Sequence, residues 1–149
     1  MGFQHFAGST RTVVDAAIRE EAAVGGRGVV EAEHLLLALA GDSGLQRLGL
    51  DHDELAAALA REEEQSLAAV GVTAEDVPAR PHFPRLGRPR LATSSKLAIE
   101  RAARITARRG QRRMTPGTVL LGVIGAEHGR VPRVLRLADV DVAELRARI

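Results

Sequence analysis

The sequence contains no cysteine, no tryptophan and no tyrosine, and it has only three phenylalanines among 149 residues. The lack of cysteine excludes disulfide bonds, thiolate metal sites and cysteine nucleophiles. The scarcity of aromatic side chains argues against readers of single-stranded nucleic acid, because these proteins stack bases on aromatic rings. The hydrophobic core must therefore consist of aliphatic side chains, as in close-packed helices.

Long apolar runs are missing as well. No run reaches the roughly 18 residues that a membrane span needs, and the N-terminus lacks the basic-then-apolar pattern of a secretory signal. We therefore expect a soluble, cytoplasmic protein. Apolar residues still make up 45% of the chain, which is enough for a core and argues against general disorder. A chain of this length fits one compact domain.

Charge is unevenly distributed, although the net charge is only +2. Residues 1–75 hold 5 arginines and 13 acidic residues, a net charge of −8. Residues 76–149 hold 16 basic and 6 acidic residues, a net charge of +10. Such asymmetry is typical of a nucleic-acid or membrane partner. It is equally typical of two halves that attract each other, or of a surface that steers partner proteins.

Two helices are predicted at the start of the chain. Ser9 or Thr10 can cap the first helix, which ends in the glycines of residues 25–28. Residues 30–39, with the sequence VEAEHLLLAL, form the second helix. This leucine-rich helix begins with acidic residues, which favour the positive end of the helix dipole, and it ends at Gly41.

The rest of the first half contains a short turn at residues 45–48 and a longer helix capped by Asp51 or Asp53. The acidic run at residues 62–64 is predicted to be the solvated end of this helix. Four prolines follow within residues 70–92, and this density precludes a long helix there. We therefore interpret residues 70–92 as a linker rich in proline and arginine.

Three helices of the second half have recognisable capping residues at their starts. These residues are Thr93 or Ser94, then Thr115 followed by Pro116, and finally Asp139 or Asp141. A short turn is predicted at residues 131–137, between the last two helices.

An internal repeat relates the two halves. Residues 11–42 align without a gap on residues 95–126, at an offset of 84, so that Leu36 falls on Leu120. Each half then contains four helices. The predicted fold is all-α, with two pseudo-twofold-related four-helix repeats packed as one domain. We expect this domain to span residues 1–149, with repeat 1 at about 3–69, the linker at about 70–92 and repeat 2 at about 93–149.

The repeated segment resembles the Clp N-terminal domain, the double Clp repeat at the front of Hsp100 unfoldases such as ClpC and ClpA. Repeats of that family carry a Gly-Thr-Glu-His-Ile-Leu-Leu-Gly-Leu motif, and residues 31–39 are Glu-Ala-Glu-His-Leu-Leu-Leu-Ala-Leu. The segment from Phe3 to Phe6 is similar to the Phe-x-x-Phe at the start of ClpC. The resemblance covers about residues 3–149, with a good match in the first repeat and a degenerate second repeat.

The resemblance implies a non-enzymatic module that binds proteins or peptides in Clp proteolysis, without a cofactor. The sequence has no Gly-x-x-x-x-Gly-Lys-Ser/Thr loop for ATP, so we expect a free-standing accessory or decoy of the unfoldase N-domain. The expected partners are the Clp unfoldase, adaptors and tagged substrates. Cyclic-peptide antibiotics bind a ClpC surface that includes the N-terminal phenylalanine, which Phe3 matches here.

The resemblance also implies candidate ligand-binding residues. In ClpC-type domains the glutamate of each Glu-His motif lies in a pocket for phosphorylated arginine, a mark for degradation. Glu33 matches this glutamate in the first repeat, with His34 and Glu31 beside it. In the second repeat Gly117 and Thr118 stand at the equivalent positions, so we expect one intact pocket. The chemistry agrees, because a guanidinium pairs with a carboxylate and a helix N-terminus binds phosphate. Alternatively, Glu33 caps its own helix.

An alternative function is nucleic-acid binding by the arginines of the second half. These are Arg101, Arg104, Arg108, Arg109, Arg112 and Arg113. Such a series can bind the phosphates of DNA or RNA, or it can be a solvated face that pairs with the acidic first half. Catalysis is not expected, because nothing around Ser9 resembles a nucleophile elbow. No metal site is predicted, because no two histidines have i+3 or i+4 spacing.

Overall fold

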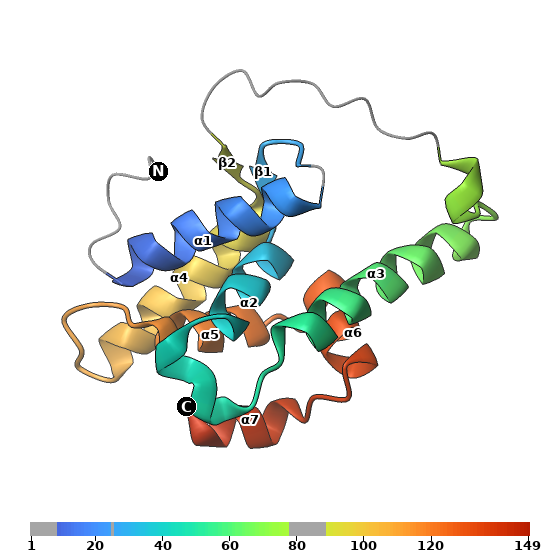
Figure 1. The fold of residues 1–149 in the computed structure, drawn as a ribbon. Coiled ribbons are helices and arrows are strands. Elements are labelled where there is room, and N and C mark those ends of the chain that lie inside the picture. The colour runs from blue at the N-terminus through green and yellow to red at the C-terminus, as the bar shows by residue number, and fades with distance from the viewer. Residues whose placement is uncertain (1–8, 25, 78–88) are drawn as a thin grey trace.

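The structure, a computed structural model, describes residues 9–24, 26–77 and 89–149. Phe3 and the middle of the expected linker therefore lie outside the described residues. The first half contains α1 (Ser9–Ala23), β1 (Val29–Val30), α2 (Ala32–Ala40), the 3₁₀ helix η2 (Ser43–Leu48), α3 (His52–Ala69) and the 3₁₀ helix η3 (Ala74–Asp76). The second half contains β2 (Arg90–Leu91), α4 (Thr93–Arg108), α5 (Pro116–Ile124), α6 (Arg130–Leu137) and α7 (Val142–Arg148) (Figure 1).

Helices α2 and α5 are equivalent elements of the two halves. Each has nine residues, and their bounds differ by 84, which is the offset of the sequence alignment. Helices α1 and α4 precede them, η2 and α6 follow, and α3 and α7 complete the two sets of four. The fold is thus all-α, with two pseudo-twofold-related four-helix repeats packed as one domain, as predicted.

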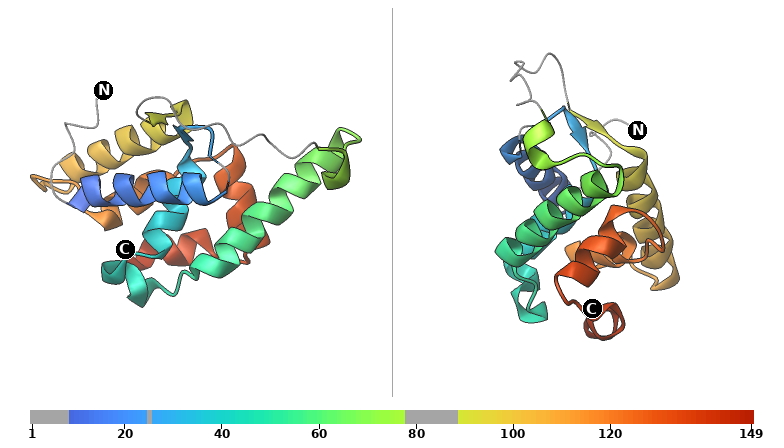
Figure 2. Two further views of the ribbon diagram at one scale, coloured as in Figure 1. Left: turned by 45° about the horizontal axis from the view of Figure 1, so that its top comes forward. Right: turned by 90° about the vertical axis from the view of Figure 1, so that its right-hand side faces the viewer.

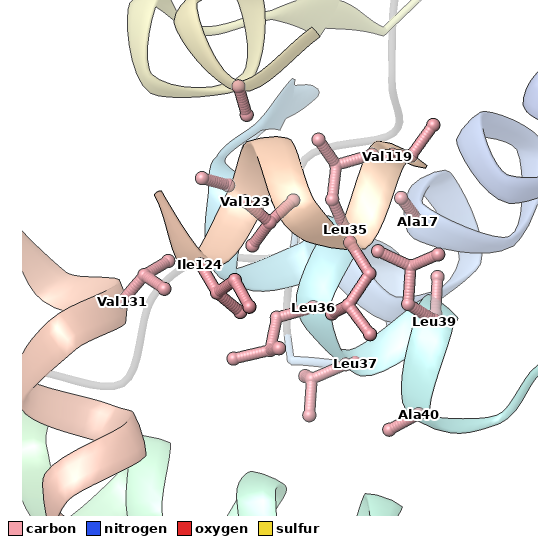
Figure 3. Packing of buried hydrophobic residues seen from close by; sticks show 14 of the residues in the cluster. Ala17, Leu35, Leu36, Leu37, Leu39, Ala40, Val119, Val123, Ile124 and Val131 are labelled. Atoms are coloured by element: carbon pink, nitrogen blue, oxygen red, sulfur yellow. The ribbon is translucent and has the colours of Figure 1, made fainter. Parts of the chain in front are cut away.

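The centre of the hydrophobic core lies between α2 and α5. All nine residues of α2 and seven of the nine residues of α5 are buried, as expected for helices that are apolar on every side. Figure 3 shows Leu35 and Leu36 of α2 close to Val123 and Ile124 of α5, while Leu39 of α2 lies beside Ala17 of α1. Helix α1 packs on α2 and α4 packs on α5, so each repeat covers one side of the shared core.

Three predicted caps are confirmed, at the starts of α3, α5 and α7. In each, the capping side chain accepts a hydrogen bond from a backbone N–H of the first turn; the residues are Asp51, Thr115 and Asp141. Pro116 occupies the first position of α5, where no N–H is needed. Helix α1 begins at Ser9, so its cap lies outside the described residues.

One prediction about helix ends is wrong, and another is wrong in part. The cap of α4 is Ala92, without a side-chain hydrogen bond, because the hydroxyl of Ser94 turns to the first repeat. The acidic run at residues 62–64 is not the end of α3, which continues to Ala69. Glu63 and Glu64 are exposed as expected, but Glu62 is only 1% exposed. The short element expected at residues 131–137 is present as α6, an eight-residue helix that begins at Arg130.

Two short strands, which we did not predict, join the repeats. Strands β1 and β2 pair in parallel. The N–H groups of Arg90 and Ala92 donate to the carbonyls of Gly28 and Val30 at 2.8 and 2.9 Å. This pairing holds the starts of α2 and α4 beside each other, although they are about sixty residues apart in the sequence.

Helix α3 extends away from the other helices at its C-terminal end (Figures 1 and 2). It has 18 residues and packs mainly on α6 and on α2. Within the described ranges, no helix is both long and apolar enough to cross a membrane.

Close packing of α4 on α5 requires Gly122. A Cβ atom at this position would lie 2.2 Å from the carbonyl oxygen of Ala98 and 2.9 Å from the backbone nitrogen of Ala102. The equivalent residue of α2 is Ala38, whose methyl group is accommodated in the core. Arg101 adds to the contact, since its Nε donates to the carbonyl of Gly122 at 2.7 Å. This cation lies near the C-terminus of α5, the negative end of its dipole.

We predict that Gly122→Ala destabilises the fold strongly. Because the new methyl group would meet backbone atoms, relief requires α4 and α5 to move apart, and overpacking of this kind costs about 1–3 kcal/mol or more. Urea unfolding would measure the loss. Gly41→Ala is the control, because a Cβ there stays at least 3.6 Å from its neighbours. A Gly122→Ala protein as stable as the Gly41→Ala protein would contradict the packing.

Candidate binding site at the start of helix α2

Side chains of the second repeat hold the start of α2. The Oγ of Ser94 accepts the N–H of Ala32 at 3.0 Å and donates to the carboxylate of Glu31. The buried Ser95 donates to the carbonyl of Val30 at 2.6 Å. The bond from Ala32 satisfies one of the N–H groups that a helix start leaves without an intrahelical partner. The hydroxyl that we predicted to cap α4 therefore serves α2.

His34 closes the first turn of α2. Its Nδ1 accepts a hydrogen bond from the N–H of Glu31 at 2.9 Å, the role that a glutamate plays in a capping box. Nδ1 must therefore be unprotonated, and the neutral ring carries its proton on Nε2. Burial lowers the pKa of His34, and this effect exceeds the opposing effect of the carboxylates, of which Glu33 contributes most. These contacts support a structural role for His34 at the helix start.

Glu33 pairs with an arginine of the other repeat. Its Oε1 accepts a hydrogen bond from Nη1 of Arg130 at 3.2 Å. The side chain of Glu33 is 8% exposed and that of Arg130 is 39% exposed, so a buried carboxylate pairs with a partly exposed guanidinium. Glu33 does not cap its own helix, because the N-cap of α2 is Glu31.

Arg130 also contacts Glu62 of α3. Its Nε lies 2.8 Å from Oε2 of Glu62, an ion pair without the alignment of a hydrogen bond. Nε of Arg133 and Oγ of Ser66 donate to the other carboxylate oxygen, Oε1, at 2.8 and 2.7 Å. Glu33, Arg130, Glu62 and Arg133 thus form a chain of alternating charges between α2, α6 and α3, which we call the Arg130 network.

The Arg130 network explains why Glu62 is ionised although it is buried. Burial raises the pKa of Glu62, but the hydrogen bonds from Ser66 and Arg133 and the charge of Arg130 together lower it by more. The pKa of Glu62 therefore lies below its usual value. A buried charge is tolerated when it is paired and hydrogen-bonded, and Glu62 meets this condition.

The second repeat has no charged group at the position of Glu33. Gly117 stands there, and a Cβ atom on it would lie 3.3 Å from Cγ2 of Ile149. The buried Thr118 serves the cap of α5, because its Oγ1 accepts the N–H of Thr115 at 2.8 Å. An open cleft of about 270 Å³ borders Gly117, with Arg109 among its lining residues. The two motif positions therefore differ in chemistry, a carboxylate in one repeat and aliphatic packing in the other.

The six arginines that we considered for nucleic-acid binding do not form one uniform row. Arg101 is partly buried and bonds to the α5 backbone, and burial lowers its pKa. Arg104 lies 3.8 Å from Glu100. The exposed members of the series are Arg104, Arg108, Arg109, Arg112 and Arg113.

The structure brings Glu31, Glu33 and His34 together, whereas Phe3 lies outside the described residues. Sequence analysis missed Arg130, Glu62 and Ser94. The sequence contains weak indications of the Arg130 network. Glu62 and Ser66 are four residues apart and Arg130 and Arg133 are three apart, so each pair shares a helix face. Spacing within one helix does not show that two such faces meet. Among the described residues, no group of three or more side chains could hold a metal ion.

Comparison with known proteins supports the fold through structure alone. No protein-family model matches the sequence, and no curated protein matches it significantly. Among solved structures, the N-terminal domain of ClpD from Arabidopsis thaliana superposes with a TM-score of 0.68 and 19% identity. The superposition covers 99% of this chain and 93% of the ClpD chain. The chain has the Clp N-terminal domain fold.

The Hsp104 N-terminal domain from Candida albicans has the same fold. Its TM-score is 0.62 at 14% identity, over 96% of this chain and 87% of that chain. At such identities the likeness concerns the fold. The Clp N-terminal domain fold that the Glu-His-Leu-Leu-Leu segment predicted is thereby confirmed.

We predict that His34 and His52 titrate on opposite sides of pH 6.5. For His52, hydrogen bonds to Asp53 and Glu20 outweigh burial and raise its pKa. The stabilisation from His34 is present above pH 6.5 and is lost as pH falls through its lowered pKa. The stabilisation from His52 is present below pH 6.5 and is lost as pH rises through its raised pKa.

Histidine NMR titration measures both pKa values. Urea unfolding of His52→Gln between about pH 5 and 7.5, a range that spans the usual histidine pKa, removes the opposing contribution of His52. The double variant His34→Gln, His52→Gln is the reference that identifies the contribution of His34. The free energy of unfolding of His52→Gln should fall as the pH is lowered. A His34 pKa at or above 6.5 would contradict the lowering expected from burial.

We predict that Glu62→Gln lowers the free energy of unfolding by about 2 kcal/mol. Breaking a buried ion pair costs about 3–5 kcal/mol, but Arg130 and Arg133 are partly exposed and water can solvate them. Glu64→Gln, at an exposed position of the same run, should change the free energy of unfolding by no more than about 0.5 kcal/mol. The difference in this free energy between the wild type and Glu62→Gln should shrink as pH falls from 4.5 through the lowered pKa of Glu62. Equal stability of Glu62→Gln and Glu64→Gln would show that the ion pairs of Glu62 do not stabilise the fold.

Proposed function

We propose that the protein is a non-enzymatic protein- or peptide-binding module linked to Clp proteolysis. The Clp N-terminal domain fold supports this, because the ClpD neighbour is described as a chaperone associated with caseinolytic protease. Its partners in this proposal are the Clp unfoldase, adaptors or tagged substrates in the cytoplasm. It acts there as an accessory or decoy of the unfoldase N-domain. Because a fold does not define a function, the finer proposal rests on the site at α2.

The ligand that we propose is phosphorylated arginine on tagged proteins, bound at Glu33. One observation carries this: the carboxylate of Glu33 already pairs with a guanidinium, that of Arg130, at 3.2 Å. The ligand's guanidinium would take the same place. Its phosphate would lie near the N-terminus of α2, where the helix dipole favours negative charge. Glu31 and His34 hold that helix start.

We propose one such site per chain. At the second motif position Gly117 packs near Ile149 and supplies no carboxylate of its own. Asp42 lines the cleft beside it, but its side chain accepts the N–H of Gly44. Cyclic-peptide binding through Phe3 belongs to the same proposal, although Phe3 lies outside the described residues.

The exposed arginines of α4 and the segment after it favour one alternative, nucleic-acid binding. Five of the six remain at the surface, namely Arg104, Arg108, Arg109, Arg112 and Arg113. Binding through phosphates is strongest at low salt, so random duplex DNA at about 50 mM salt is the sensitive probe.

Calorimetry with free phosphoarginine tests the proposed function. The wild type should bind it, and Glu33→Gln should bind at least about tenfold more weakly, because a charge-assisted hydrogen bond contributes about 1.5–3 kcal/mol. Glu64→Gln is the control and should bind like the wild type. Unimpaired binding by Glu33→Gln would show that the pocket is assigned to the wrong residue.

A pull-down from the native cytoplasm tests the partner class. It should recover Clp subunits, adaptors or arginine-phosphorylated proteins. Recovery of nucleic acid alone, together with duplex DNA binding at about 50 mM salt, would replace the proposal by the alternative.

A further inference from the structure

Arg130 occupies the carboxylate on which the proposed site depends. Its Nη1 lies 3.2 Å from Oε1 of Glu33. The side chain of Glu33 is 8% exposed and that of Arg130 is 39% exposed, so Arg130 is the more accessible member of the pair. Any guanidinium that binds Glu33 must therefore take the place of Arg130.

Arg130 can leave Glu33 without losing its charge partner. A different nitrogen, Nε, contacts Glu62 at the shorter distance of 2.8 Å. Glu62 is fixed in turn by Arg133 and Ser66 on its other oxygen. A rotation about the end of the Arg130 side chain therefore removes Nη1 from Glu33 while the ion pair with Glu62 stays. The N–H groups released in this way can donate to a new acceptor beside Glu33.

The charges decide which ligand supplies that acceptor. An unmodified arginine brings one guanidinium, so it replaces one ion pair of Glu33 by another and places two positive charges side by side. A phosphorylated arginine brings a guanidinium together with a phosphate, which adds negative charge and strong acceptor oxygens. Guanidinium–phosphate pairs are short and frequently bidentate, so the released N–H groups of Arg130 gain a partner at least as good as Glu33.

We propose that Arg130 is the specificity-determining residue of this site. It rejects unmodified arginine because it holds Glu33 itself. It admits phosphorylated arginine because its N–H groups move from the carboxylate of Glu33 to the phosphate of the ligand. This inference rests on the proposed function, since it requires Glu33 to be the carboxylate that binds the ligand.

The test compares free phosphoarginine with free arginine by calorimetry on the wild type, Arg130→Gln and Arg136→Gln. In Arg130→Gln, phosphoarginine should bind at least about tenfold more weakly, the effect of losing a charge-assisted hydrogen bond. Arginine should bind more tightly than to the wild type, because Glu33 is no longer occupied. Arg136→Gln is a matched control, since Arg136 is an exposed arginine of the same helix outside the Arg130 network, and it should keep the wild-type ratio of the two affinities.

The outcomes separate this inference from the proposed function. If the wild type binds phosphoarginine through Glu33 but Arg130→Gln keeps the affinity ratio, the inference is wrong and the proposed function stands. An equal loss of affinity for both ligands would assign Arg130 a purely structural role and also overturn the inference. If neither the wild type nor Arg130→Gln binds phosphoarginine, the inference falls together with the proposed pocket.

NMR of the arginine side chains gives a second measurement on the wild type, which decides the matter even if Arg130→Gln does not fold. Phosphoarginine should shift the side-chain N–H signals of Arg130 and leave those of Arg133 nearly unchanged. Free arginine at the same concentration should leave both unchanged. Unshifted Arg130 signals at saturating phosphoarginine would overturn the inference.

Discussion

The mutual burial of α2 and α5 is the constraint on which the rest of the structure depends. Beyond the polar residues of their first turns, Glu33, His34 and Thr118, both helices are apolar on every side and need cover all round. The partner helices α1 and α4 supply one layer, and the two central helices cover each other. Gly122 lets α4 approach α5 to backbone contact. The polar groups of the candidate site lie where this apolar core ends, at the start of α2.

Sequence reasoning succeeded where local chemistry decides the structure. Residues close together in the chain determine each apolar stretch and the caps at Asp51, Thr115 and Asp141. The offset of 84 follows from aligning the two apolar stretches, α2 and α5. It failed where distant groups decide. Residues 62–64 have the composition of a solvated face, and only the approach of α6 makes Glu62 a buried ion-pair partner.

For the same reason, only part of the candidate site could be predicted from the sequence. Glu31, Glu33 and His34 share one motif, and their grouping followed from the sequence. Ser94 and Arg130 come from the other repeat, and the periodicity of the sequence does not show that they contact the start of α2. The repeats have kept their shared leucines and diverged at the helix start, where Glu33 meets Arg130 and Gly117 meets Ile149. A difference at a helix start does not change the core. One repeat can therefore bind a ligand while the other has only a structural role.

Ser94 and Arg130 belong to the second repeat, and this has a consequence for how such a molecule could arise. The contacts of Ser94 and Arg130 with the first motif cross from the second half of the chain. A solitary ancestral repeat would therefore have lacked both the hydroxyl and the guanidinium, unless a second copy of itself supplied them across a symmetric interface. Isologous pairing of that kind gives two identical sites. Fusion into one chain frees the copies from symmetry, and the contrast between Glu33 and Gly117 is an asymmetry that a pair of identical repeats cannot have.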